Sequence, residues 1–209
     1  MAPRCGLYED EEAQQLLLGM SKPRRALFLD RDGVINVDHG YVHRSEDTRW
    51  LPGIFGVCRT AIEAGCLVIV VTNQAGIARG YYSEATFRDY TRWMHAQFKA
   101  RGVVLHATYY CPHHPDAPDP SCRQCGCRKP APGMILEAAR RYNIALGESA
   151  MLGDKPWDVQ AGQSAGIGLN LRFSTDANPA PGVVRTLDEA AWIIHQYFES
   201  CAGGADAEA

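Results

Sequence analysis

Arg25-Ala26-Leu27-Phe28-Leu29-Asp30-Arg31-Asp32-Gly33 is the stretch of sequence from which the fold and the site of this protein are predicted. Four apolar residues run directly into two aspartates at i and i+2, and a glycine then breaks the run. A short apolar run that ends at a turn residue is typical of a strand buried inside a parallel sheet, and such sheets bind ligands at the carboxyl ends of their strands. Two carboxylates that converge there repel each other unless they share a cation or a proton. A solvated Asp-x-Asp-Gly turn explains the motif alone equally well, so the rest of the chain has to decide.

The composition indicates a globular protein without general affinity for polyanions. The chain has 209 residues, of which 46% are hydrophobic and 22% charged, which suits a single domain. A net charge of -3 argues against non-specific nucleic-acid binding, which needs many lysines and arginines. The amino terminus lacks a signal-peptide pattern, and the longest apolar run, Cys66 to Val71, is far too short to cross a membrane. We therefore expect a cytoplasmic monomer that binds neither nucleic acid nor membrane.

Strand and helix patterns alternate along the chain, which predicts an α/β fold with a doubly wound parallel sheet and helices on both faces. Helices are expected from about Gly53, Ser83, Pro132, Trp157 and Asp188, with Ser83 and Asp188 as N-caps and the last helix ending near Glu199. The expected strands are residues 26–29, 66–71, 103–110, 150–152 and 167–171, with 183–184 as an edge strand.

The expected domain organisation is a single α/β domain over residues 24–200, which includes the cysteine- and histidine-rich loop 111–127. A leader over residues 1–23, with one short helix around 11–20, precedes it, and a disordered tail over 201–209 follows it. The polar segment 34–51 suits a flap over the site. The chain between Asp30 and Thr72, and between Thr72 and Lys129, is already filled by the predicted helices. Neither interval is therefore long enough for a separate cap domain inserted over the site.

Four polar residues follow the predicted strands: Asp30, Thr72, Lys129 and Asp154. Because the carboxyl ends of parallel strands share one edge of the sheet, we expect these side chains to meet. Each has an ordinary explanation alone, as a strand end, a solvated cation or a helix cap. Together with Asp32 they supply a nucleophile, an acid, a cation for the equatorial oxygens and a magnesium site, which are the parts that phosphoryl transfer from a monoester needs.

The segments Asp30-Arg31-Asp32-Gly33, Thr72-Asn73-Gln74, Lys129 and Gly153-Asp154 with Asp158 resemble the four motifs of the haloacid dehalogenase (HAD) superfamily of phosphatases. The resemblance implies that Asp30 is the nucleophile and Asp32 the general acid and base. It implies that Thr72 binds the phosphoryl group, that Lys129 neutralises its charge, and that Asp30, Asp154 and the main-chain carbonyl of Asp32 hold Mg²⁺. Asp158 would order its neighbours or simply lie exposed in a first helical turn.

A loop rich in cysteine and histidine is the second strong pattern. Cys111-Pro-His113-His114 and Cys122-Arg-Gln-Cys125-Gly-Cys127 offer six candidates for the four places of a closed tetrahedral zinc site. Such a site would be structural, because it leaves no position open for water. Disulfides are the alternative, and an intracellular setting disfavours them.

Among HAD phosphatases, the chain most resembles those that act on D-glycero-D-manno-heptose 1,7-bisphosphate, an activity of heptose biosynthesis, and the related histidinol-phosphate phosphatases. The resemblance lies in residues 38–41, 72–80, 109–115 and 127–130, and it departs at Ala75, where many relatives have serine. It implies hydrolysis of the C7 phosphate and zinc ligands at Cys111, His113, Cys125 and Cys127, which leaves Cys122 and His114 as spectators. The substrate contacts that we predict are Asp38, His39, Gly40, Tyr41, Asn73, Gln74, Lys155 and, for the second phosphate, Arg128.

Two rival hypotheses remain at this stage. Histidinol-phosphate hydrolysis would use the same machinery on another small phosphorylated substrate. A zinc-stabilised binding module with a vestigial site is the rival from another class, and the presence of every catalytic residue type argues against it.

Overall fold

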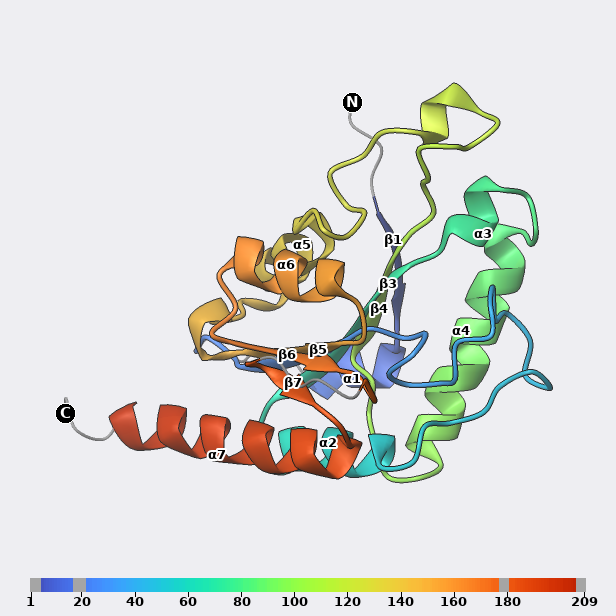
Figure 1. The fold of residues 1–209 in the computed structure, drawn as a ribbon. Helices are drawn as coiled ribbons and strands as arrows, with labels where there is room; N and C mark the ends of the chain where they lie inside the picture. Colours follow the sequence, from blue (N-terminus) through green and yellow to red (C-terminus); the bar gives the residue numbers. More distant parts are fainter. Residues whose placement is uncertain (1–4, 17–21, 177–180, 206–209) are drawn as a thin grey trace.

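The computed structural model describes residues 5–16, 22–176 and 181–205, and its centre is one seven-stranded sheet (Figure 1). In spatial order the strands are β1 (Gly6–Glu9), β4 (Ala107–Cys111), β3 (Leu67–Asn73), β2 (Ala26–Leu29), β5 (Ala150–Gly153), β6 (Leu169–Phe173) and β7 (Val183–Val184). Every neighbouring pair is parallel except β1 with β4, which is antiparallel. The predicted doubly wound parallel sheet is confirmed, with one antiparallel edge strand added to it.

Helices cover both faces of the sheet. The helices are α1 (Glu11–Leu16), α2 (Ile54–Glu63), α3 (Ala75–Ala78), α4 (Glu84–Lys99), α5 (Gly133–Tyr142), α6 (Pro156–Ala165) and α7 (Leu187–Ala205). Figure 1 shows α2 and α7 together below the sheet and α5 and α6 above it. Two short 3₁₀ helices lie at Pro120–Cys122 and Leu146–Glu148.

The central strand β2 contributes to two separate hydrophobic cores. Leu27 and Leu29 pack in the core formed with α2, α4 and α7, whereas Ala26 and Phe28 pack in the core formed with α5 and α6. Successive side chains of a strand point to opposite faces, so a strand covered on both sides must be apolar at every position. This is why the apolar run before Asp30 is continuous.

Helix α4 has the cap and the buried face that its sequence predicts. Ser83 Oγ accepts a hydrogen bond from the backbone N–H of Thr86 at 3.0 Å, which satisfies a donor of the first turn. Its apolar residues at helical spacing, Phe87, Tyr90, Met94 and Phe98, are all buried.

The predicted division at residue 23 is not a domain boundary in the structure. Residues 6–9, which were assigned to the leader, form β1 and pair with β4. Glu9 also contacts α5: its carboxylate forms an ion pair with Arg141 and accepts a hydrogen bond from the Tyr142 hydroxyl at 2.6 Å. A four-residue edge strand has too short a pattern to be recognised locally, because its stability comes from hydrogen bonds to a distant strand. The expected leader helix begins at Glu11 and is described to Leu16; residues 17–20 lie outside the described ranges.

The carboxyl-terminal helix differs from the prediction at both ends. Its N-cap is Thr186, whose Oγ1 accepts from the backbone N–H of Glu189 at 3.0 Å, while Asp188 lies inside the first turn. The helix continues to Ala205, so residues 201–205 are helical where a disordered tail was expected; residues 206–209 lie outside the described part. The predicted strand 103–110 begins only at Ala107, although Val103 and Leu105 are buried in the core.

The segment between β2 and α2 is a loop held by isolated bridges such as Asn36 to Trp50, as expected for a flap. In the described ranges, no further domain is inserted there or between α4 and α5. None of the helices in those ranges is long and apolar enough to cross a membrane.

Candidate active site

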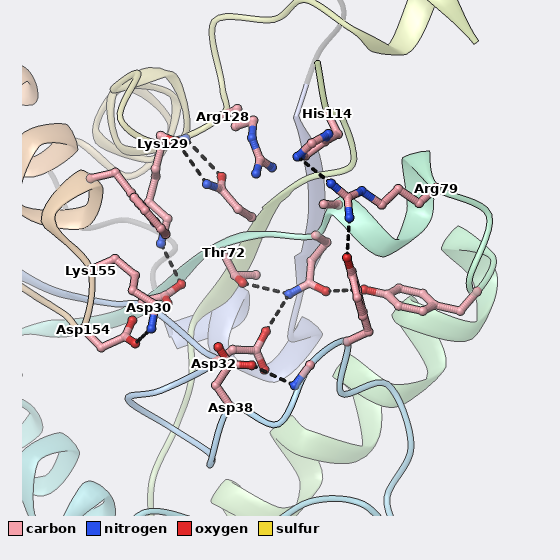
Figure 2. A pocket seen from close by; sticks show the side chains of 17 residues that line it. Asp30, Asp32, Asp38, Thr72, Arg79, His114, Arg128, Lys129, Asp154 and Lys155 are labelled. Atoms are coloured by element: carbon pink, nitrogen blue, oxygen red, sulfur yellow. Dashed lines mark hydrogen bonds and ion pairs between the residues drawn. The ribbon is translucent and has the colours of Figure 1, made fainter. Parts of the chain in front are cut away.

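A cavity of about 400 Å³ opens at the carboxyl edge of the sheet, and the four residues expected to meet there all line it (Figure 2). Asp30 follows β2, Thr72 lies near the end of β3, Asp154 follows β5, and Lys129 precedes α5. This volume lies within the range typical of small-molecule sites.

The Lys129 ammonium is buried among three acceptors. Its Nζ lies 2.6 Å from Asp30 Oδ1, 2.7 Å from the carbonyl oxygen of Val71 and 2.7 Å from Asp158 Oδ1. Burial raises the pKa of Asp30 and the positive charge of Lys129 opposes that rise. Burial alone would lower the pKa of Lys129, but Asp30 and Asp158 raise it, so the lysine stays charged. The carboxyl group of Asp30 is thus held beside a fixed cation.

Asp158 is a positioning residue of this pair. Its side chain is fully buried, so the exposed position considered from sequence is wrong. Besides Lys129, it accepts from the backbone N–H of Lys155 at 2.9 Å, and thereby orders the turn that carries Asp154.

Asn73, predicted as a substrate contact, forms two hydrogen bonds with the backbone of Lys129. Its Nδ2 donates to the carbonyl oxygen of Lys129 at 3.1 Å, and its Oδ1 accepts from the N–H of Lys129 at 3.0 Å. Asn73 also lines the cavity, but its amide is committed to aligning the lysine.

The residues around Asp154 fit a divalent cation. Oxygens of Asp30, Asp154 and Asp158 lie within 4.8 Å of one another. Asp154 Oδ2 pairs with Lys155 Nζ at 2.5 Å, whereas Asp154 Oδ1 is buried and has no hydrogen-bond partner among the described residues. Buried carboxylate oxygens need a partner, and Mg²⁺ prefers oxygen ligands. Gly33 has φ +92°, and a Cβ there would overlap Asp154, so this close approach requires glycine.

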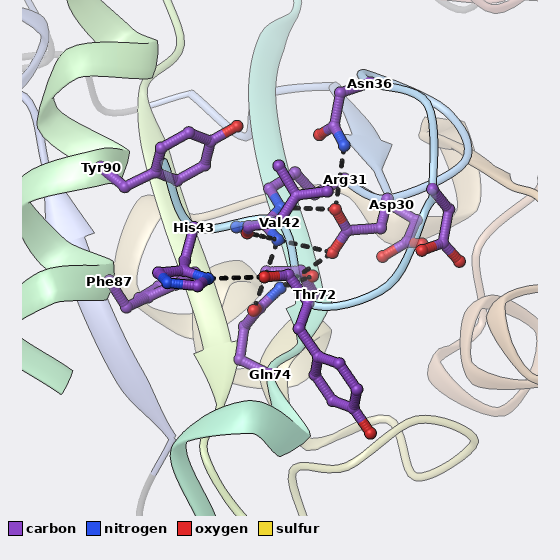
Figure 3. Close-up of polar contacts among 12 residues, drawn as sticks. Asp30, Arg31, Asn36, Val42, His43, Thr72, Gln74, Phe87 and Tyr90 are labelled. Atoms are coloured by element: carbon purple, nitrogen blue, oxygen red, sulfur yellow. Dashed lines mark hydrogen bonds and ion pairs between the residues drawn. The ribbon is translucent and has the colours of Figure 1, made fainter. Parts of the chain in front are cut away.

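The Asp32 carboxylate is held by a network around the buried Arg31. Figure 3 shows Arg31 with Asn36, Val42 and Gln74 around it. Arg31 donates to Asp32 through Nε at 3.1 Å and Nη2 at 2.6 Å; Asn36 Nδ2 and Gln74 Nε2 donate at 3.0 and 3.2 Å. The Arg31 guanidinium is fully buried, donates to the carbonyl oxygen of Val42 at 2.7 Å and lies over two aromatic rings, those of Phe87 and Tyr90. Arg31 is not among the predicted site residues, because no local pattern distinguishes a buried arginine from a solvated one.

Gln74, also predicted as a substrate contact, is almost fully buried and serves protein groups. It donates to Thr72 Oγ1 at 2.8 Å and accepts from the Tyr82 hydroxyl at 2.7 Å. Because Thr72 Oγ1 accepts this bond, its own proton remains available for an oxygen atom in the cavity.

The structure places every predicted substrate contact except His39 at the cavity. Asp38, Gly40, Tyr41, Arg128 and Lys155 line the cavity, whereas His39 is exposed and is not among the lining residues. Arg79, His114 and Trp157 also line the cavity, although none of them was predicted as a substrate contact. Arg79 lies in the segment 72–80 that carries the family resemblance, so it could have been predicted. His114 and Trp157 reach this edge of the sheet only through the fold.

Four residues of the cysteine and histidine loop form a compact cluster, and they are the four that the resemblance implied. Cys111 Sγ lies 3.5 Å from Cys125 Sγ and 3.6 Å from His113 Nδ1, and Cys127 Sγ lies 3.5 Å from His113 Nδ1. A tetrahedral zinc site places its ligand atoms about 3.5–3.8 Å apart. All eight cysteines are free, so the geometry fits a metal and not disulfides. Cys122 and His114 lie outside the cluster.

Comparisons with known proteins identify the family of this chain. A HAD-hydrolase-like family model matches residues 126–171. The chain is 45% identical over 177 residues to the D-glycero-beta-D-manno-heptose-1,7-bisphosphate 7-phosphatase of Yersinia pestis, a match that covers 84% of this chain and 93% of that protein. The chain belongs to the heptose-bisphosphate phosphatase family of HAD-like hydrolases.

Two further relatives extend the comparison. The Escherichia coli K12 enzyme of the same name is 42% identical, with 84% of this chain and 91% of that protein covered. The crystal structure of D,D-heptose 1,7-bisphosphate phosphatase from B. bronchiseptica, complexed with magnesium and phosphate, superposes with a TM-score of 0.69 at 32% identity and covers 82% of this chain and 98% of that chain. The predicted family and fold are therefore confirmed, and the protein is a phosphatase of the heptose-bisphosphate family.

Proposed function

We propose that this protein hydrolyses the C7 phosphate of D-glycero-β-D-manno-heptose 1,7-bisphosphate, as its relatives' names state for them. The observation that carries the proposal is the buried Asp30 carboxylate, 2.6 Å from the Lys129 ammonium and beside the unpartnered Asp154 Oδ1. Phosphoryl transfer needs such a nucleophile next to fixed positive charge.

Asp30 attacks the phosphorus through Oδ2, because Oδ1 is bound to Lys129. The bond from phosphorus to the C7 oxygen breaks, Asp32 protonates that oxygen, and an aspartyl-phosphate forms on Asp30. Asp32 then takes a proton from the water that hydrolyses this intermediate. Lys129 and the Thr72 hydroxyl bind the transferring oxygens. Mg²⁺, held by Asp30, Asp154 and the carbonyl of Asp32, would supply further positive charge to the phosphoryl group.

The zinc cluster acts on the reaction indirectly in this proposal. Arg128 Nη1 donates to the carbonyl oxygen of His113 at 3.1 Å, and Lys129 follows directly in the chain. A zinc ion on Cys111, His113, Cys125 and Cys127 would therefore fix the direction in which both cations point. We further propose that the protein is a cytoplasmic monomer without nucleic-acid or membrane partners; its charge of -3 supports the absence of non-specific nucleic-acid binding.

The test compares kcat/KM on the heptose bisphosphate and on histidinol phosphate, with magnesium present. We expect a preference for the bisphosphate; a preference for histidinol phosphate would overturn the substrate assignment but keep the mechanism. Asp30→Asn should lower kcat by at least about 10³-fold with unchanged folding. Asp89→Asn, at an exposed position on α4, is the matched control and should keep full activity. Full activity of Asp30→Asn would falsify the nucleophile.

A further inference from the structure

Arg31 lies between Asp30 and Asp32 in the chain, is fully buried and is not among the residues that line the cavity. Its guanidinium binds both carboxylate oxygens of Asp32: Nε lies 3.1 Å from Oδ1, and Nη2 lies 2.6 Å from Oδ2. The last side-chain torsion of an aspartate is soft, so a carboxylate without such partners turns easily. A guanidinium that binds both oxygens fixes the plane of the carboxylate.

The Arg31 guanidinium is itself held by two separate parts of the fold. Its Nη2 also donates to the carbonyl oxygen of Val42, in the flap, at 2.7 Å. Its Cζ lies 5.4 Å from the ring centroid of Phe87 and 5.2 Å from that of Tyr90, both on α4 (Figure 3). Aromatic faces attract a cation at such distances. The position of Arg31 is therefore set by the protein before any ligand binds.

The two oxygens of Asp32 accept hydrogen bonds from four N–H donors, two on each oxygen. Besides Arg31, Oδ1 accepts from Asn36 Nδ2 at 3.0 Å and Oδ2 accepts from Gln74 Nε2 at 3.2 Å. A carboxylate has about four lone-pair sites, so a proton reaches Asp32 only where one donor gives way. Asn36 is fully buried and is not a lining residue, whereas Gln74 lines the cavity and makes the longest of the four bonds. Oδ2, on the side of Gln74, is therefore the oxygen open to exchange with the cavity.

Stability alone explains this arrangement poorly. Arg31 Nη1 is buried and has no hydrogen-bond partner among the described residues. In a buried ion pair, the loss of hydration offsets much of the attraction between the charges. The arrangement thus favours a fixed orientation of the Asp32 carboxylate over the greatest stability.

We propose that Arg31 is the positioning residue for both proton transfers of Asp32. It holds Oδ2 where the leaving oxygen, and then the attacking water, can exchange a proton with it. The inference rests on the proposed function for the role of Asp32 as general acid and base, and it adds a residue that does not touch the substrate. Without Arg31 the carboxylate turns out of this orientation and both proton transfers slow down, whereas the attack of Asp30 on phosphorus needs no proton.

The test uses p-nitrophenyl phosphate, which separates the two steps of the reaction. When Asp30 attacks the phosphorus, the ester bond breaks and p-nitrophenolate leaves with the electron pair as a stable anion, so this step needs no proton from Asp32. In the second step, water attacks the aspartyl-phosphate, a proton of that water passes to Asp32, and inorganic phosphate leaves Asp30. Stopped-flow absorbance follows the release of p-nitrophenolate.

In Arg31→Met, we expect a burst of about one p-nitrophenolate per active site, because the aspartyl-phosphate accumulates. The turnover that follows should be about 10- to 100-fold slower than in wild type, the effect expected of a misplaced acid and base. With the heptose bisphosphate both steps need Asp32, so kcat should fall by at least the same factor and without a burst. KM should change by less than about threefold, because Arg31 makes no contact with the cavity.

Arg31→Lys keeps the buried charge, but an ammonium cannot bind both oxygens in one plane. Its slow phase should lie between those of Arg31→Met and wild type, and it provides the test if thermal unfolding shows that Arg31→Met does not fold. Arg140→Met is the matched control, because it removes a guanidinium from an exposed ion pair on α5 and should leave both phases unchanged.

The proposal is overturned if Arg31→Lys, and Arg31→Met where it folds, turn over p-nitrophenyl phosphate within about twofold of wild type. It is equally overturned if burst and turnover fall in parallel, since that would indicate a smaller folded fraction, or if the first step slows as much as the second. Failure of the proposed function would be seen separately, as absent hydrolysis of the heptose bisphosphate by the wild-type protein.

Discussion

Replacing Asp158 with asparagine removes one carboxylate from the buried cluster and keeps the shape of the side chain. Asp158 binds Lys129 Nζ at 2.7 Å through Oδ1 and the N–H of Lys155 at 2.9 Å through Oδ2. An amide has one accepting oxygen, so one of these two donors would face an NH₂ group. The side chain cannot move away, because it packs directly against Gly153.

The expected loss in the free energy of unfolding is about 1–3 kcal/mol, the cost of leaving one buried donor without an acceptor, because Lys129 keeps Asp30 as its counter-ion. Because domains of this kind are stable by only about 5–15 kcal/mol in total, the effect should be large. Urea unfolding followed by tryptophan fluorescence, without added magnesium, measures it. Asp89→Asn is the control, since Asp89 forms an exposed pair with Arg92 on one helix and should cost less than about 0.5 kcal/mol. A loss below about 1 kcal/mol for Asp158→Asn would refute the role given to the buried charge.

Two further predictions concern the zinc cluster and the buried histidines. The protein should contain about one zinc per chain; Cys125→Ser should lower that content and Cys122→Ser should not, as elemental analysis can determine. If Cys125→Ser keeps its zinc, Cys125 is not a ligand. Burial lowers the pKa of His95 and of His106 to about 4, so both are neutral when folded. Stability should therefore be complete above pH 6.5 and fall as pH drops toward 4, by about 2 kcal/mol per histidine at pH 5. NMR titration of the ring protons checks this, and a midpoint near 6.5 for either histidine would contradict it.

The part of the site at the carboxyl ends of the strands could be predicted because its residues follow strands with strong local patterns. The apolar runs before Asp30, Thr72 and Asp154 indicate strands, and parallel strands bring their carboxyl ends to one edge. The role of Asp158 could not be settled in this way. Its sequence position allowed either an exposed first-turn residue or a buried partner, and only the packing of α6 against the sheet distinguishes them.

The sequence by itself determined the parallel strands, the family and the polar residues that follow the strand ends, because each is encoded in residues close together along the chain or in strand periodicity. The tertiary structure alone decided which side chains face each other across the cavity: the buried Arg31 on Asp32, the clasp of Asn73 on Lys129, and the meeting of Arg79 with His114. It also decided that residues 6–9 complete the sheet. These features depend on contacts between residues distant in sequence, whose energies no local pattern records.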